Sequence, residues 1–134
     1  MAQVTRSVTL NAAPGEVWAV IGGFQSLADW HPAVETSVRD DIGGVEHRRL
    51  GLVGGGEILE KNLGADAMSY GYEIIESPLP VAGYKATISV ADAGGGKAVV
   101  VWSSTFEGTA DGASDIIAGI YTAGLDALAA KFGT

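Results

Sequence analysis

The sequence predicts an α+β fold in which one antiparallel sheet is covered by a long C-terminal helix. Two observations lead to this class. Strand-like runs separated by glycines fill the chain from Val34 to Phe106, and the hydrophobic period changes to that of a helix after residue 114. The breaks between the runs are short, so hairpins are the expected connections. The predicted order of elements is β-α-α-β-β-β-β-β-β-α.

A strand followed at once by a short helix is predicted at the N-terminus. Residues Val4–Leu10 place apolar side chains on one face at period two, as a half-buried strand does. Pro14 suits the first position of a helix, Glu16 lies in its positive first turn, and Gly22 and Gly23 end it. The apolar stripe of this helix consists of Val17, Trp18, Val20 and Ile21.

Further strands and a long helix are predicted for the rest of the chain. The expected turns are Asp41–Gly44, Gly51–Gly56, Gly64–Asp66, Ser77–Gly83 and Ala93–Gly96. The last segment, Asp115–Lys131, has one wide apolar face at helical spacing. A helix of roughly 18 residues rises about 1.5 Å per residue, which is long enough to cross a sheet diagonally.

Composition excludes several classes of function. The 134 residues fit one domain spanning 1–134, and the net charge of −8 opposes binding to nucleic acid or anionic lipid. No apolar run is long enough for a membrane span and no secretory leader is seen, so we expect a cytoplasmic protein. The absence of cysteine and the presence of only two histidines argue against a metal site. No motif for a cofactor is found, so none is expected.

Four segments together resemble one superfamily over nearly the whole chain. They are the stretch from Pro14 to Ser37, with its Ala-Asp-Trp-His-Pro loop, and the segments Tyr70–Ala86, Val100–Phe106 and Tyr121–Leu128. The pattern resembles the START / Bet v 1-like (SRPBCC) superfamily, and within it the bacterial polyketide cyclase/dehydrase-like proteins. The resemblance implies a helix-grip fold, a curved seven-stranded antiparallel sheet wrapped around the C-terminal helix over a ligand cavity.

The chain is also similar, more distantly, to the plant abscisic acid receptors. Their pocket has a lysine where Glu35 falls and a glutamate where Glu57 falls. Glu57 therefore matches the receptors, whereas Glu35 reverses the charge that would pair with the carboxylate of the hormone.

Strand alternation predicts which side chains face the cavity. Arg48 shares a face with Leu50, and we expect it to pair with Glu57 on the next strand as the polar centre. The alternative is that both charges lie at the rim of the sheet and are solvated. The predicted ligand-binding residues are Glu35, Arg48, Leu50, Glu57, Leu59, Tyr72, Leu79, Tyr84, Ser103, Ile116, Ile120 and Gly124.

Four residues permit two interpretations. His31 precedes a proline and is interpreted as structural rather than catalytic, and His47 is expected to be exposed. For the strand that contains Trp102 and Ser103, alternation predicts that Trp102 points inward, whereas the resemblance implies that Ser103 does. We follow the resemblance. Gly124 either leaves room for a ligand or allows close helix packing.

Three classes of function are compatible with these residues. The first is binding or carriage of a small hydrophobic or aromatic molecule, which we favour. The second is a cyclase- or dehydrase-like enzyme in which Glu57, Arg48 and Tyr72 are catalytic. The third is an interaction module whose cavity is filled by side chains. A connected cavity would argue against the third class, and the sequence leaves monomer and homodimer open.

Overall fold

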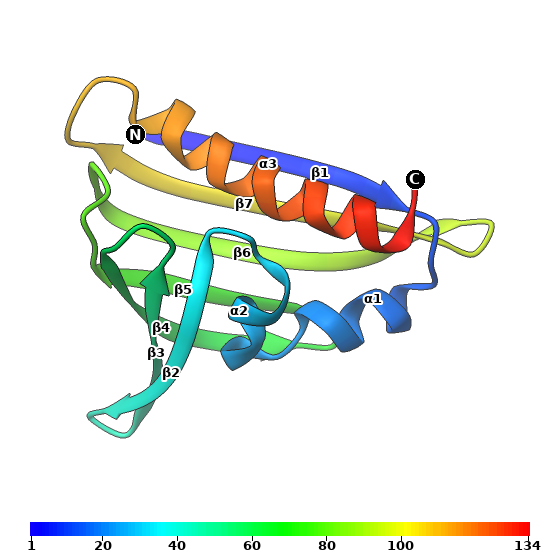
Figure 1. The fold of residues 1–134 in the computed structure, drawn as a ribbon, viewed down its shortest axis with the longest axis horizontal. Coiled ribbons are helices and arrows are strands. Elements are labelled where there is room, and N and C mark those ends of the chain that lie inside the picture. The colour runs from blue at the N-terminus through cyan, green and yellow to red at the C-terminus, as the bar shows by residue number, and fades with distance from the viewer.

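The computed structural model describes residues 1–134 and contains seven strands and three α-helices (Figure 1). The elements in chain order are β1 (Ala2–Leu10), α1 (Pro14–Ile21), the short 3₁₀ turn η1 (Phe24–Ser26), α2 (Leu27–Trp30), β2 (Val34–Ile42), β3 (Val45–Leu52), β4 (Glu57–Asp66), β5 (Ser69–Glu76), β6 (Val81–Gly94), β7 (Lys97–Gly108) and α3 (Ala113–Phe132). This order confirms the predicted one.

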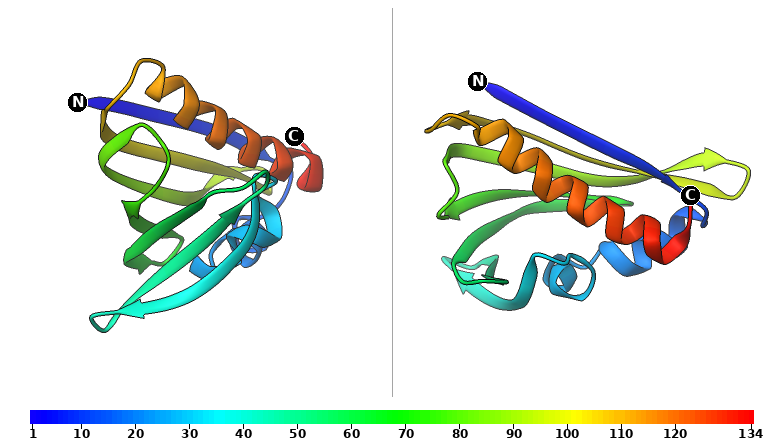
Figure 2. Two further views of the ribbon diagram at one scale, coloured as in Figure 1. Left: turned by 60° about the vertical axis from the view of Figure 1, so that its left-hand side comes forward. Right: turned by 45° about the horizontal axis from the view of Figure 1, so that its top comes forward.

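The seven strands form one antiparallel sheet in the order β1-β7-β6-β5-β4-β3-β2. Strands β2 to β7 follow one another as a meander, and β1 pairs with β7 from Ala2 opposite Phe106 to Leu10 opposite Ala98. The sheet is strongly curved, and α3 runs along its concave side (Figure 2). The helix-grip fold predicted from the sequence is therefore confirmed.

Helix α3 covers the sheet with one apolar face. Ile117, Tyr121, Leu125 and Leu128 recur at the spacing of a helical turn and are buried. The helix begins after Gly112, whose φ of 82° is the left-handed conformation that favours glycine. Neither α3 nor any other helix is long and apolar enough to cross a membrane.

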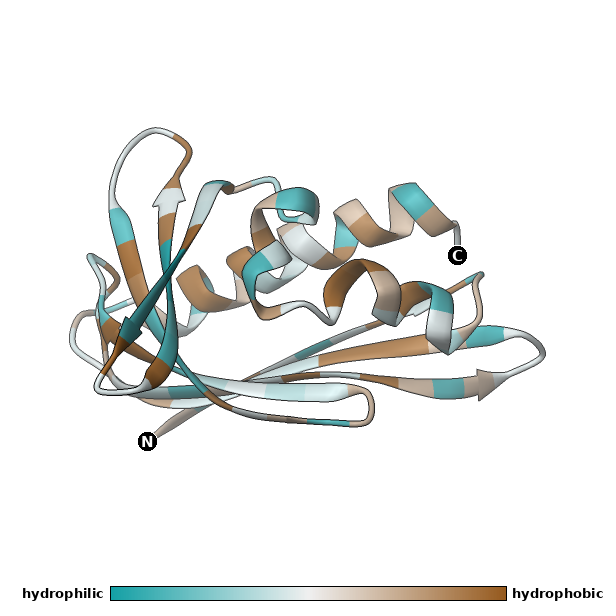
Figure 3. Ribbon diagram, turned by 90° about the horizontal axis from the view of Figure 1, so that it is seen from below, coloured by the Kyte–Doolittle hydropathy of each residue, from teal (hydrophilic) through white to brown (hydrophobic).

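A continuous apolar core fills the space between the sheet and the helices. Figure 3 shows apolar stretches both on the helices and on the long strands beneath them. Phe24, Trp30 and Ile21 enter this core from the α1–α2 region, and Trp102 and Phe106 enter it from β7. The inward position of Trp102 follows simple alternation along β7, so our expectation that Ser103 points inward is wrong.

The turn between β3 and β4 is built from three consecutive glycines. Gly54, Gly55 and Gly56 all have positive φ, between 87° and 105°. The amide of Leu52 donates to the carbonyl of Gly56, which joins the two ends of the turn, and Val53 donates to the carbonyl of Ala33. These bonds fix the turn against the segment between α2 and β2, beside the cavity described next.

Candidate functional site

An apolar cavity that is partly open to solvent lies between α3, the sheet and the β3–β4 turn. Its volume is about 190 Å³, and 15 of its 18 lining residues are hydrophobic. Five of the predicted ligand-binding residues line it, namely Leu50, Tyr72, Leu79, Tyr84 and Ile120. An apolar cavity of about 150 Å³ is large enough to bind benzene in another protein. The space here therefore suits a molecule of about one ring.

Arg48 lies behind the wall of this cavity and is completely buried. Its Nε donates to Oε1 of Glu60 at 2.8 Å, and its Nη2 lies 2.7 Å from the same oxygen. Its Nη1 donates to the carbonyl of Phe24 at 2.7 Å and to the hydroxyl of Tyr70 at 3.3 Å. The guanidinium also lies 4.2 Å from the ring centre of Phe24 and 4.9 Å from that of Tyr72. Protein groups therefore surround the charge, and Glu60 rather than Arg48 lines the cavity.

The partner of Arg48 differs from the expected one. The register of β3 and β4 places Arg48 opposite Glu60 and Gly51 opposite Glu57. The side chain of Glu57 is 60% exposed and accepts from Nη1 of Arg49 at 3.3 Å. The expected Arg48–Glu57 pair is therefore wrong, because Glu57 lies on the opposite face of the sheet. The sequence could not fix this face, since Ile58 and its neighbour Leu59 are both apolar and both buried.

Burial and mutual attraction act against each other in the Arg48–Glu60 pair. Burial raises the pKa of Glu60, and the adjacent guanidinium opposes this rise. Burial is the largest single effect on Arg48 and disfavours its charge, but Glu60, Tyr70 and Tyr72 together outweigh it, so the pKa of Arg48 lies above its usual value. Because both contacts from Arg48 reach Oε1, Oε2 of Glu60 has no hydrogen-bond partner in the protein. The cavity wall thus contains a carboxyl group with one free oxygen.

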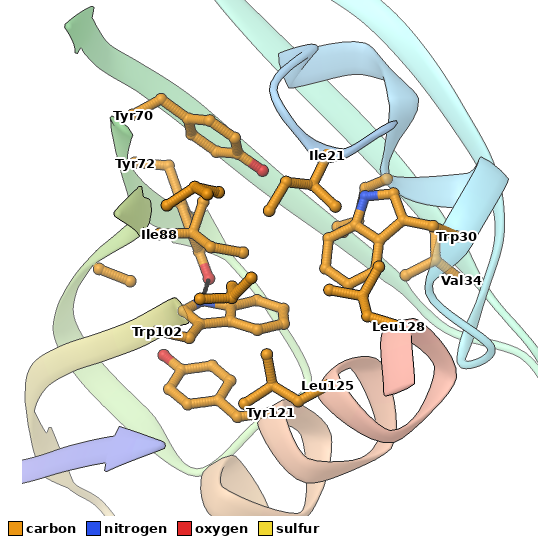
Figure 4. Packing of buried hydrophobic residues seen from close by; sticks show 14 of the residues in the cluster. Ile21, Trp30, Val34, Tyr70, Tyr72, Ile88, Trp102, Tyr121, Leu125 and Leu128 are labelled. Carbon is orange, nitrogen blue, oxygen red and sulfur yellow. Dashed lines mark hydrogen bonds between the residues drawn. The ribbon is translucent and has the colours of Figure 1, made fainter. Parts of the chain in front are cut away.

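A chain of hydroxyl groups forms the second polar feature of the cavity. Nε1 of Trp102 donates to the hydroxyl of Tyr72 at 3.0 Å, which is bonded to the hydroxyl of Tyr84 at 3.1 Å. The hydroxyl of Tyr84 is bonded in turn to that of Tyr121. Figure 4 shows Tyr72, Trp102 and Tyr121 converging from β5, β7 and α3.

These tyrosines are protonated at neutral pH, and burial makes them still harder to ionise. It raises the pKa of Tyr72 and of Tyr84 well above the usual value, and it raises the pKa of Tyr121 to about 12. The three hydroxyls therefore act as neutral hydrogen-bonding groups rather than as phenolate bases.

His31 lines the cavity but has no free ring nitrogen. Its Nδ1 accepts from the amide of Ala33 at 3.1 Å, so the ring proton is on Nε2, which donates to the carbonyl of Ile120 at 2.8 Å. Burial, the largest effect, lowers the pKa of His31 and keeps the ring neutral. These bonds support the structural interpretation of His31.

Other predicted residues lie away from the cavity or differ in exposure. Glu35 and Ile116 are exposed, with Ile116 43% exposed although it lies one turn from Ile120. Leu59 is buried opposite Arg49 on the outer side of the hairpin, and Ser103 lines a polar groove on the outer face of the sheet. The expectation that His47 is exposed is wrong, because it is only 5% exposed and its Nδ1 lies 2.9 Å from the carbonyl of Val45.

Gly124 lies where α3 packs against His31, which follows α2. A Cβ atom at this position would lie 2.7 Å from Cδ2 of His31 and 3.1 Å from the ring of Trp102. Of the two alternatives for this glycine, close packing is the one found.

The structure contains no group of three or more acidic, histidine or cysteine side chains placed to hold a metal ion.

Sequence reasoning missed Glu60 and Tyr121 as cavity residues. Tyr121 lies on the apolar face predicted for the last helix, so the sequence indicates its inward position but not its hydrogen bond to Tyr84. Glu60 could have been found by placing Ile58, rather than Leu59, on the same face as Leu50. The missing information was the register of one hairpin.

Comparisons with known proteins agree with this fold. Residues 1–133 match the family described as "Polyketide cyclase / dehydrase and lipid transport". The protein XoxI from Bacillus cereus is 35% identical in sequence to this chain. Its structure matches with a TM-score of 0.91, over 98% of this chain and 96% of that one. No curated protein matches the chain.

Two more distant structures share the fold alone. The ZhuI aromatase/cyclase from Streptomyces is 18% identical with a TM-score of 0.72, over 97% of this chain and 92% of that one. A START superfamily protein from Mycobacterium smegmatis is 13% identical with a TM-score of 0.70, over 96% and 92% of the two chains. The family match over residues 1–133, together with this shared fold, confirms the resemblance to the START / Bet v 1-like superfamily drawn from the sequence.

Proposed function

Because this chain belongs to the polyketide cyclase/dehydrase and lipid transport family, we propose that it binds a small, largely apolar molecule in the cavity between the sheet and α3. The observation that carries this proposal is the composition of the cavity wall. Fifteen of the 18 lining residues are hydrophobic, three tyrosines among them, and the polar groups are Glu60 and the hydroxyls of these tyrosines. An apolar wall with a few convergent polar groups is the usual form of a small-molecule site.

The size of the cavity limits the molecule. Sites for drug-sized ligands occupy about 300–1,000 Å³, whereas this cavity has a volume of about 190 Å³. The space that remains open also argues against an interaction module whose interior is filled by side chains. A ligand with one ring fits this space better than a fused polycyclic one.

Two substitutions on one helix test the proposal. Ile120→Trp introduces a large side chain at the cavity wall, whereas Ile116→Trp introduces it one turn earlier at an exposed position. In an NMR titration with toluene, we expect shifts of the amides around the cavity in the native protein and in the Ile116→Trp variant. The Ile120→Trp variant is expected to lose at least about tenfold in affinity. Equal binding by both variants, or no binding by the native protein, contradicts the proposal.

An enzymatic role is the second candidate, and Glu60 is the observation that favours it. A buried carboxyl group that lines a cavity, has a raised pKa and has one oxygen without a hydrogen-bond partner is suited to general acid-base catalysis. In this candidate Glu60 takes the role that we expected of Glu57. Ring closure and dehydration of a polyketide both require removal of a proton next to a carbonyl group, which Glu60 would accept.

Deuterium exchange tests this candidate without knowledge of the substrate. In heavy water, the methyl protons of acetophenone exchange when a base removes them. If Glu60 is the base, the native protein accelerates the exchange and Glu60→Gln reduces the acceleration by about 10²–10⁴-fold. Glu57→Gln is the control and should retain the full rate. Absence of acceleration, or a fully active Glu60→Gln variant, excludes this mechanism and leaves binding as the function.

A further inference from the structure

The tyrosine chain always has one hydroxyl proton more than it can use. Trp102 can only donate, so the hydroxyl of Tyr72 is an acceptor at that end of the chain. The hydroxyls of Tyr72, Tyr84 and Tyr121 carry one proton each, and only two bonds link them. Whichever way the chain is oriented, one proton has no acceptor among the three. The buried hydroxyl of Ser104 lies near that of Tyr121 but has no hydrogen-bond partner in the structure, so it does not take up this proton.

Glu60 has a hydrogen-bond acceptor that is not used within the protein. Both nitrogens of Arg48 that approach Glu60 reach Oε1, and Oε2 has no partner. No hydrogen bond joins Glu60 to any of the three tyrosines of the chain, although Glu60, Tyr72, Tyr84 and Tyr121 all line the cavity. The unused donor and the unused acceptor therefore do not satisfy each other, and leaving both unpaired in an apolar cavity is costly.

The other polar groups of the cavity wall are already satisfied. Both ring nitrogens of His31 are bonded to the backbone, and the indole N–H of Trp102 is bonded to Tyr72. The remaining wall is apolar. A ligand that satisfies this cavity must therefore accept one hydrogen bond and donate one, and the rest of it must be hydrophobic.

A hydroxyl group on an aromatic ring meets all of these conditions. We propose that the cavity binds a neutral phenol of a single ring, whose hydroxyl accepts the surplus tyrosine proton and donates to Oε2 of Glu60. This inference rests on the proposed function, since it names the ligand class for the same cavity. The ring occupies the space of about 190 Å³ between the apolar side chains.

Ligands with a full charge fit this arrangement less well. A carboxylate would face Glu60 without a cation, because Arg48 does not line the cavity and is already bonded to Glu60, Phe24 and Tyr70. An ammonium group could donate to Glu60, but it has no lone pair to accept the tyrosine proton. Among neutral ligands, an ether or a ketone can accept the tyrosine proton, but it has no hydrogen-bond donor for Glu60.

A series of probes that share one ring tests the inference on the native protein. Phenol, anisole, toluene, benzoate, benzylamine and 2-naphthol are titrated separately by NMR, and their dissociation constants are compared. We expect phenol to bind at least about tenfold tighter than toluene and anisole, because anisole cannot donate to Glu60 and toluene makes neither bond. Benzoate, benzylamine and 2-naphthol are each expected to bind more weakly than phenol.

The outcomes separate this inference from the proposed function. If toluene and phenol bind equally, the polar groups do not select the ligand, and the inference fails while the binding function stands. If benzylamine or benzoate binds most tightly, the inference that the ligand is neutral is wrong. If 2-naphthol binds most tightly, the inference that the ligand has a single ring is wrong. If no probe binds, the proposed function itself fails.

Glu60→Gln and Glu57→Gln form a matched pair of variants for the same titration. Glu60→Gln removes the charged acceptor and should reduce the preference for phenol over anisole by about tenfold, whereas Glu57→Gln should leave it unchanged. An unchanged preference in a folded Glu60→Gln variant contradicts the role of Glu60. If this variant does not fold, the probe series on the native protein decides the question alone.

Discussion

The ion pair between Arg48 and Glu60 should make these two residues strongly coupled in stability. Arg48→Met leaves the carboxylate of Glu60 buried without a cation, and breaking a buried pair in this way costs about 3–5 kcal/mol. Glu60→Met leaves the guanidinium uncompensated at a similar cost. The double variant removes both charges and keeps the apolar volume. Only the carbonyl of Phe24 and the hydroxyl of Tyr70 then lose a donor, at about 1–3 kcal/mol.

Urea denaturation of the native protein, the two single variants and the double variant measures this coupling. We expect a coupling free energy of unfolding of at least about 3 kcal/mol. Arg49→Met is the control, since Arg49 is partly exposed and its ion pairs with Asp40 and Glu57 should contribute under about 1 kcal/mol. Costs of the two single variants that add within about 0.5 kcal/mol in the double variant would refute the reasoning.

The loss of stability in the Arg48→Met variant should depend on pH. Without Arg48, burial alone acts on Glu60, so its pKa in the folded protein lies above the unfolded value of about 4.5. The folded variant then binds a proton that the unfolded chain has already released, and its stability falls as the pH rises through this window. The deficit of Arg48→Met relative to the native protein should therefore be smaller at pH 5 than at pH 8. A deficit that does not change with pH contradicts a buried, ionised Glu60.

Two further predictions concern α3 and the loop that it contacts. The pKa of His31 in the folded protein is below the unfolded value of about 6.5, so acidification protonates the unfolded chain first. The native protein should lose up to about 1.4 kcal/mol per pH unit below pH 6.5 relative to His31→Gln, and parallel stability curves of the two proteins would rule this out. Gly124→Ala should cost about 1–3 kcal/mol because its Cβ would overlap the ring of His31. Gly119→Ala, on the exposed side of α3 with nothing within 4 Å, should instead stabilise the helix by about 0.5–1 kcal/mol, and a destabilised Gly119→Ala variant would show that helix propensity does not govern this position.

The fold was predictable because its signals are local. The glycine-bearing turns, the apolar face of α3 and the Pro14 start of α1 each follow from neighbouring residues, and the structure has each element within a few residues of its expected bounds. The cavity residues Tyr72 and Tyr84 were placed by the same kind of reasoning, since each alternates regularly with apolar neighbours on its strand.

The polar centre was not predictable because it depends on pairing between distant residues. Arg48 could be assigned to the inner face, but its partner depends on the register of β3 and β4, which the adjacent apolar residues Ile58 and Leu59 leave ambiguous. A shift of one residue exchanges the two faces of a strand, so Glu57 and Glu60 exchanged roles. Tyr121 joins the tyrosine chain from α3, and no pattern within one element reveals a contact between a helix and two strands.

The pairing of β1 with β7 determines when the binding site can form. Because the whole β2–β6 meander separates these two strands in the sequence, they can pair only after β7 has been synthesised. Contacts between distant parts of a chain slow folding, because the entropy of closing the intervening loop is lost before the contacts form. Helix α3, which packs along β1, closes the cavity from the same late segment. On the ribosome, the meander of β2 to β6 should therefore emerge as an open, partly apolar sheet, and the site should be completed only when α3 has also emerged.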